Sequence, residues 1–154
     1  MHGIILIEQV LIDMANAIPD PKSHSSSEDY KRIVLDIDGT LCKEKDGATS
    51  YSSVLPNLDI IARLKEYKKE NFYIILYTSR QMRTYKNNIG QINANTLPLI
   101  IDWLKRYDVP YDEIIVGKPW CGFKGFYVDD KAIRPDEFLN FSYHKIRDLL
   151  HLGD

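Results

Sequence analysis

Short apolar segments alternate with segments of helical periodicity along most of this chain, and this alternation limits the folds it can adopt. The apolar segments, expected to be strands, cover residues 33–35, 72–77, 113–116 and 125–128. Apolar residues at helical spacing predict helices over residues 58–68 and 97–107, and a closing helix over residues 138–152. Strands and helices in alternation predict an α/β fold with a mainly parallel sheet flanked by helices.

The chain length and a change in composition suggest one main domain with an appendage. The 154 residues fit a single domain. Residues 1–30 are expected to form an N-terminal appendage, a helix or strand followed by a serine-rich linker, and residues 31–154 the main domain.

Charge and hydropathy argue against several classes of partner. The formal net charge of -2 gives no basic field for nucleic acid, so we expect no nucleic-acid partner. No apolar run approaches the roughly 18 residues that span a membrane, and the apolar start lacks a basic flank. The two cysteines lie far apart and show no zinc-ligand spacing. We therefore expect a cytoplasmic protein with no membrane partner.

Polar or charged residues follow each expected strand directly. In a parallel α/β sheet, ligands bind at the carboxyl ends of the strands, so these residues should lie at one edge. They are Asp36, Asp38, Gly39 and Thr40 after the first strand, Thr78, Ser79 and Arg80 at the second, Lys118 after the third, and Asp129 and Asp130 after the fourth.

The segment Asp36-x-Asp38-Gly39-Thr40 contains the residue types that hydrolysis of a phosphate ester requires. Asp36 can act as the nucleophile and form an acyl phosphate. Asp38 can protonate the leaving group and then deprotonate the attacking water. The N–H groups of Gly39 and Thr40 could contribute to an anion-binding nest. The alternative is a turn rich in Asp, Gly and Thr.

Residues after the next two strands could bind the phosphate. The Thr78 hydroxyl and the Ser79 N–H can bond phosphate oxygens, although Thr78 could equally end its strand in a turn. Lys118 can stabilise the nucleophile and the transferring phosphoryl group, its alternative being a solvated surface lysine. Arg80 could bind an anionic substrate or be a surface residue.

Magnesium is the expected cofactor, because a carboxylate and a phosphate repel each other unless a cation lies between them. Asp36 and the backbone carbonyl of Asp38 are candidate ligands. Asp129 or Asp130 should bind the metal directly or through water, because adjacent buried acids need a nearby cation. The alternative for Asp129 and Asp130 is an exposed acidic turn.

Taken together, these residues resemble the four motifs of the haloacid dehalogenase superfamily. Asp36 and Asp38 match its first motif, Thr78 its second, Lys118 its third, and Asp129 with Asp130 its fourth. The resemblance implies a Rossmann-like core, and the short segments between motifs imply that there is no cap domain. It also implies a magnesium-dependent phosphoric monoester hydrolase, since dehalogenases proper lack the second aspartate of the first motif.

A narrower resemblance is to the small capsule-biosynthesis phosphatases of bacteria. It depends on segments such as Thr78-Ser79-Arg80-x-Met82 and Gly117-Lys118-Pro119-Trp120-Cys121. Ser79 departs from the alanine that this subgroup carries in its second motif. The expected substrate is a small phosphorylated metabolite, with surface-polysaccharide synthesis as the pathway that this resemblance implies, and a neighbouring subunit of a homo-oligomer could close the open site. The alternatives are a phosphatase acting on a phosphoprotein or a nucleic-acid end, a phosphoryl transferase, and a non-catalytic assembly subunit.

Overall fold

The computed structural model describes residues 31–45 and 50–153. The elements in chain order are β1 (Arg32–Leu35), the 3-10 helix η1 (Tyr51–Ser53), α2 (Leu58–Lys69), β2 (Tyr73–Thr78), α3 (Ile89–Asn95), α4 (Leu97–Arg106), β3 (Glu113–Val116), α5 (Pro135–Asn140) and α6 (Tyr143–Leu149). Predictions about residues 1–30 lie outside the described residues. No helix within the described ranges is long and apolar enough to cross a membrane.

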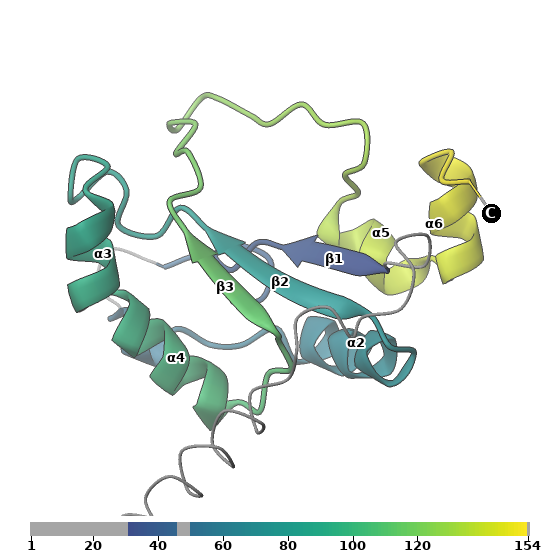
Figure 1. Ribbon diagram of the computed structural model, residues 1–154, viewed down its shortest axis with the longest axis horizontal. Coiled ribbons are helices and arrows are strands. Elements are labelled where there is room, and N and C mark those ends of the chain that lie inside the picture. Colours follow the sequence, from purple (N-terminus) through teal and green to yellow (C-terminus); the bar gives the residue numbers. More distant parts are fainter. Residues whose placement is uncertain (1–30, 46–49, 154) are drawn as a thin grey trace, which may run out of the picture. The chain divides into compact units, whose positions relative to one another are not determined.

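The three strands form one parallel sheet in the order β1-β2-β3 (Figure 1). Leu35 of β1 pairs with Leu76 of β2, and Leu76 pairs in turn with Ile114 of β3. Parallel neighbours need crossover connections, which α2 supplies between β1 and β2, and α3 and α4 between β2 and β3. The predicted α/β fold with a parallel sheet flanked by helices is confirmed.

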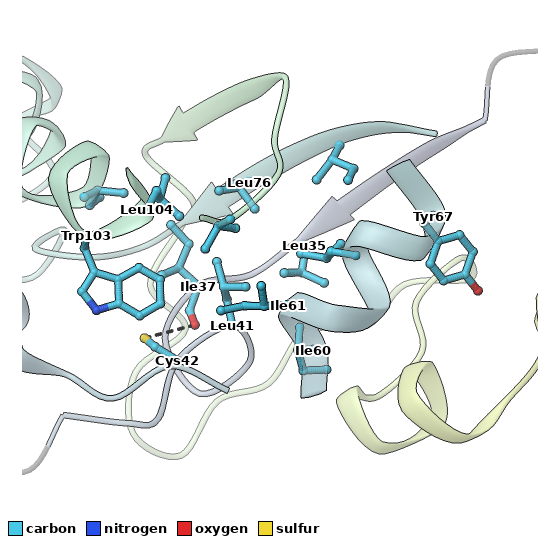
Figure 2. Close-up of a cluster of buried hydrophobic side chains, with 14 of the residues drawn as sticks. Leu35, Ile37, Leu41, Cys42, Ile60, Ile61, Tyr67, Leu76, Trp103 and Leu104 are labelled. Carbon is cyan, nitrogen blue, oxygen red and sulfur yellow. Dashed lines mark hydrogen bonds between the residues drawn. The ribbon is translucent and has the colours of Figure 1, made fainter. Parts of the chain in front are cut away.

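One face of the sheet forms the hydrophobic core. Residues paired in register share a face, so Leu35, Leu76 and Ile114 point the same way. Figure 2 shows Leu35 and Leu76 beside Ile61 of α2 and Leu104 of α4. Burial of such side chains is the main favourable contribution to folding.

The two long helices begin and end where their sequences predict. In α4, Pro98 occupies the first turn, where the missing N–H costs no helical hydrogen bond, and Lys105 and Arg106 lie in the last turn. In α2, Asp59 lies in the first turn and Lys68 in the last, which also suits the helix dipole.

Two sequence-based predictions of local structure are wrong. Residues 125–128 form no strand, and Phe126 and Val128 are exposed by 79% and 87%. The predicted closing helix is two helices, because the chain is extended at Phe141 and the Ser142 side chain accepts from the Lys145 N–H to begin α6.

The missing strand has a physical explanation. An apolar run shows that a segment can pair in a sheet, whereas pairing itself depends on whether the segment reaches a neighbouring strand edge. Here residues 117–134 leave β3, arch away from the sheet and return at α5 (Figure 1). Within this loop, Gly125 approaches Cys121 so closely that an added Cβ would lie 2.0 Å from the Cys121 carbonyl oxygen.

Candidate active site

The carboxyl ends of β1, β2 and β3 bring three of the predicted residues to one edge of the sheet. Asp36 follows β1, Thr78 is the last residue of β2, and Lys118 follows β3 after Gly117. The Lys118 N–H donates to the Thr78 carbonyl at 3.1 Å, which continues the pairing of β2 and β3 beyond the last strand residue. Asp36, Thr78 and Lys118 therefore lie at the carboxyl edge of β1–β3, where we expected them from the sequence.

Asp36 and Lys118 form an ion pair at this edge. Lys118 Nζ lies 3.2 Å from Asp36 Oδ1, and the Lys118 side chain is only 16% exposed. Burial raises the pKa of Asp36, while the charge of Lys118 and the hydrogen bonds from Lys118 and Ile37 oppose this rise. Lys118 is thus a partner of the predicted nucleophile, and not the solvated lysine of the alternative interpretation.

Aromatic rings surround the Lys118 ammonium group. It lies 4.4 Å from the ring centroid of Tyr127 and 6.0 Å from that of Tyr77. Gly117, with φ of 92°, makes the turn that leads from β3 to Lys118. An added Cβ at Gly117 would lie 2.8 Å from Ile89 Cδ1, the end of a flexible side chain that could move, so the positive φ is the main reason that glycine suits this turn.

Asp38 is bound by Arg80 through both of its carboxylate oxygens. Arg80 Nε donates to Oδ2 at 3.0 Å and Nη2 donates to Oδ1 at 2.7 Å. The Arg80 side chain is 2% exposed, whereas that of Asp38 is 29% exposed. Arg80 was predicted to contact substrate or to lie on the surface. In the structure its guanidinium group is buried and contacts the Asp38 carboxylate.

The residues predicted to bind phosphate differ in what they can offer. The Thr78 hydroxyl accepts from the Arg80 N–H at 3.0 Å, so the expected turn at the strand end exists, and the hydroxyl keeps its own proton to donate. Ser79 lies next to it, partly buried. The N–H groups of Gly39 and Thr40 already donate to the carbonyls of Cys42 and Ile37, so the predicted nest is not formed by these two groups.

Asp129 and Asp130 lie in the arching loop and not at the tip of a strand. Both are exposed, and the Asp129 carboxylate accepts from the Lys131 N–H at 2.7 Å, which makes an acidic turn. The prediction that they follow a fourth strand is wrong, because segment 125–128 is not paired. Their proposed role in binding metal stays a prediction.

The sheet edge presents the Asp36 carboxylate, an oxygen ligand of the kind that magnesium prefers, but its side chains do not by themselves complete a metal site. Magnesium is held by oxygen ligands, often one or two carboxylates with several waters. Here the Asp36 carboxylate is paired with Lys118, and both Asp38 oxygens accept from Arg80. Within residues 31–45 and 50–153, no three acidic, histidine or cysteine side chains come together as a metal site.

Three residues at the site had no sequence signal that assigned them there. The Tyr51 ring lies 4.6 Å from the Arg80 guanidinium carbon, and the buried Cys42 thiol donates to Asp38 Oδ1 at a sulfur–oxygen distance of 3.7 Å. Tyr127 lies over Lys118, and its hydroxyl donates to the Pro119 carbonyl at 2.5 Å. Tyr51 lies far from Arg80 in the chain, and although Cys42 and Tyr127 lie close in sequence to Asp38 and Lys118, no motif around them predicts these contacts.

Comparison with known proteins identifies a related family and a related solved structure. Residues 33–102 match the model of the haloacid dehalogenase-like hydrolase family, a range that includes Asp36, Asp38, Thr78 and Arg80. A crystal structure from Vibrio cholerae is 49% identical in sequence, with a TM-score of 0.75, and the match covers 79% of this chain and 97% of that one. No protein with a curated description is similar enough in sequence to count as a match.

Proposed function

Because the chain belongs to the haloacid dehalogenase-like hydrolases, we propose that it is a phosphatase that hydrolyses a phosphate monoester of a small metabolite. The observation that carries the proposal is the Asp36–Lys118 pair, with its 3.2 Å distance between Lys118 Nζ and Asp36 Oδ1. A carboxylate beside a lysine, at the carboxyl edge of a parallel sheet, suits nucleophilic attack on phosphorus.

The first step transfers the phosphoryl group to the enzyme. An Asp36 oxygen forms a bond to phosphorus while the bond from phosphorus to the leaving oxygen breaks. The leaving oxygen takes the proton of the Asp38 carboxyl group, so the product leaves as a neutral alcohol. Lys118 stabilises the charge on the transferring phosphoryl group.

The second step releases phosphate. A water oxygen attacks the phosphorus of the aspartyl phosphate, and the bond between phosphorus and the Asp36 oxygen breaks. Asp38 takes a proton from the water, which restores both carboxyl groups to their starting states.

Magnesium is the proposed cofactor. It would neutralise the repulsion between a carboxylate and a phosphate dianion. Asp36, the Asp38 carbonyl and either Asp129 or Asp130 are its proposed ligands.

The proposed substrate class rests on two features: the small size of the domain, and the resemblance of its motifs to those of known phosphatases. Phosphorylated intermediates of surface-polysaccharide synthesis are the first to test, because several segments resemble those of capsule-biosynthesis phosphatases. A phosphopeptide and a 3'-phosphorylated oligonucleotide represent the alternative, in which the enzyme acts on a macromolecule.

The test is release of phosphate from a panel of these compounds, with magnesium and with EDTA. We expect the wild type to release phosphate only with the metal, and Asp36→Asn to lose at least about 10³-fold in rate. Asp102→Asn is the matched control, because Asp102 is an exposed aspartate on α4 with its side chain 76% exposed. Full activity in Asp36→Asn would refute the mechanism, and turnover of the macromolecules alone would refute the substrate class.

A further inference from the structure

Arg80 binds Asp38 in a bidentate geometry that fixes both oxygens of the carboxylate. The two hydrogen bonds, 3.0 Å from Nε to Oδ2 and 2.7 Å from Nη2 to Oδ1, form a planar fork. Such bidentate pairs constrain direction as well as distance. A lysine could supply the charge at this position, but its single ammonium group lacks the rigid, parallel pair of N–H donors that the guanidinium fork provides.

The surroundings of Arg80 fix the guanidinium group in turn. Its backbone N–H donates to the Thr78 hydroxyl at 3.0 Å, and its Nη2 donates to the Cys42 sulfur at 3.7 Å. The Tyr51 ring covers the group at 4.6 Å from the guanidinium carbon. With a side chain 2% exposed, Arg80 is too enclosed to bind a substrate group directly.

Asp38 remains accessible on the side that Arg80 does not occupy. Its side chain is 29% exposed, and its charge is close enough to Asp36 to affect that residue electrostatically. A carboxylate has about four lone-pair positions, of which Arg80 uses two and the Cys42 thiol, which donates to Oδ1, uses a third. One oxygen can therefore carry or receive a proton while the fork stays in place.

We propose that Arg80 is a positioning residue that holds Asp38 in the orientation needed to protonate the leaving oxygen, with Tyr51 keeping the guanidinium group in place. This inference rests on the proposed phosphatase activity. Proton transfer requires the donor within hydrogen-bond reach of the leaving oxygen, and a freely rotating Asp38 would spend most of its time elsewhere.

The leaving group of the substrate provides a readout that a loss of stability would not imitate. An alkyl phosphate needs its leaving oxygen protonated, whereas p-nitrophenyl phosphate releases a stable phenolate with little help. The value of kcat/KM reports the first phosphoryl transfer for both. A defect in the proton donor should thus lower the alkyl value much more than the aryl value.

The experiment compares kcat/KM for the two esters in Arg80→Lys, Tyr51→Leu and Asp38→Asn. We expect Arg80→Lys to lose at least about 10-fold more on the alkyl ester than on the aryl ester, with Asp38→Asn showing a larger difference of the same kind. Tyr51→Leu, which keeps the ion pair, should show a smaller difference. Arg134→Lys is the control, since the Arg134 side chain is 82% exposed, and should change neither value.

Each other outcome overturns the inference. Equal losses on both esters in Arg80→Lys would show a purely structural role, and a rise in KM with unchanged kcat would show a substrate-binding role. If Arg80→Lys fails to fold, the Tyr51→Leu variant decides. Equal relative changes of kcat/KM on the alkyl and aryl esters in Tyr51→Leu would then reject the positioning role of Arg80. If Asp38→Asn is selective and the other two variants are not, the proposed function stands without this role. A wild type inactive on every phosphate ester removes both.

Discussion

Lys118 Nζ lies 3.2 Å from Asp36 Oδ1, although the two residues follow different strands with β2 between them. The parallel sheet makes this pairing, because strands running the same way end at the same edge. The pair joins a partly buried carboxylate to a cation that is itself covered by the Tyr127 ring.

We expect Lys118→Met to lower kcat/KM by about 10²–10³-fold, because it removes the charge beside the reacting phosphoryl group but keeps an apolar stem. Lys118→Arg should lose less, since it keeps the charge. Phosphate release measures both, with Lys65→Met as the control on the surface of α2, where Lys65 pairs with the exposed Asp108. Wild-type activity in Lys118→Met would contradict the role assigned to the pair.

The stability of the protein should depend on the charge of Asp36. Burial raises its pKa in the folded state, so the folded protein binds this proton more tightly than the unfolded chain. The stabilisation from this proton is complete below the unfolded pKa and is lost as pH rises through the folded pKa. Asp36→Asn should therefore have the higher melting temperature at pH 7, and this difference should shrink toward pH 4. A lower melting temperature for Asp36→Asn at pH 7 would show that the pair with Lys118 outweighs the cost of burial.

The two cysteines should differ sharply in reactivity. Burial, together with the charge of Asp38, raises the pKa of the Cys42 thiol to about 12, whereas Cys121 is exposed. The thiolate is the reactive form, so a thiol reagent at pH 8 should label one cysteine in the native protein and both after unfolding. Cys121→Ser should abolish native labelling, and rapid labelling of that variant would show that Cys42 is accessible.

Trp103 should contribute to stability through one buried hydrogen bond. Its indole N–H donates to the Val54 carbonyl at 2.8 Å, and the residue is 1% exposed. Trp103→Phe leaves this carbonyl unpaired and should lower the free energy of unfolding by about 1–3 kcal/mol, measured by chemical denaturation. Trp120→Phe, at a residue 40% exposed, should change it by less than about 0.5 kcal/mol. Equal effects would argue against the buried bond.

Local patterns were enough to predict most of the regular structure. The apolar runs and helical spacing identified β1, β2, β3, α2 and α4 to within a residue or two. They could not show that segment 125–128 lies outside the sheet, because an apolar run looks the same whether or not it finds a neighbouring strand. The break between α5 and α6 depends on a cap at Ser142 that an apolar pattern also conceals.

For the site, the order of residues in the chain was enough to show which of them follow the strands, and hence that Asp36, Thr78 and Lys118 would share an edge. This follows because parallel strands have their carboxyl ends at the same edge of the sheet, so the residues after them lie at that edge. Only the tertiary structure decided their partners: Lys118 with Asp36, Arg80 with Asp38, and Tyr51 over Arg80. These contacts join residues far apart in the chain, and their geometry depends on how the loops after each strand pack, which no local spacing encodes.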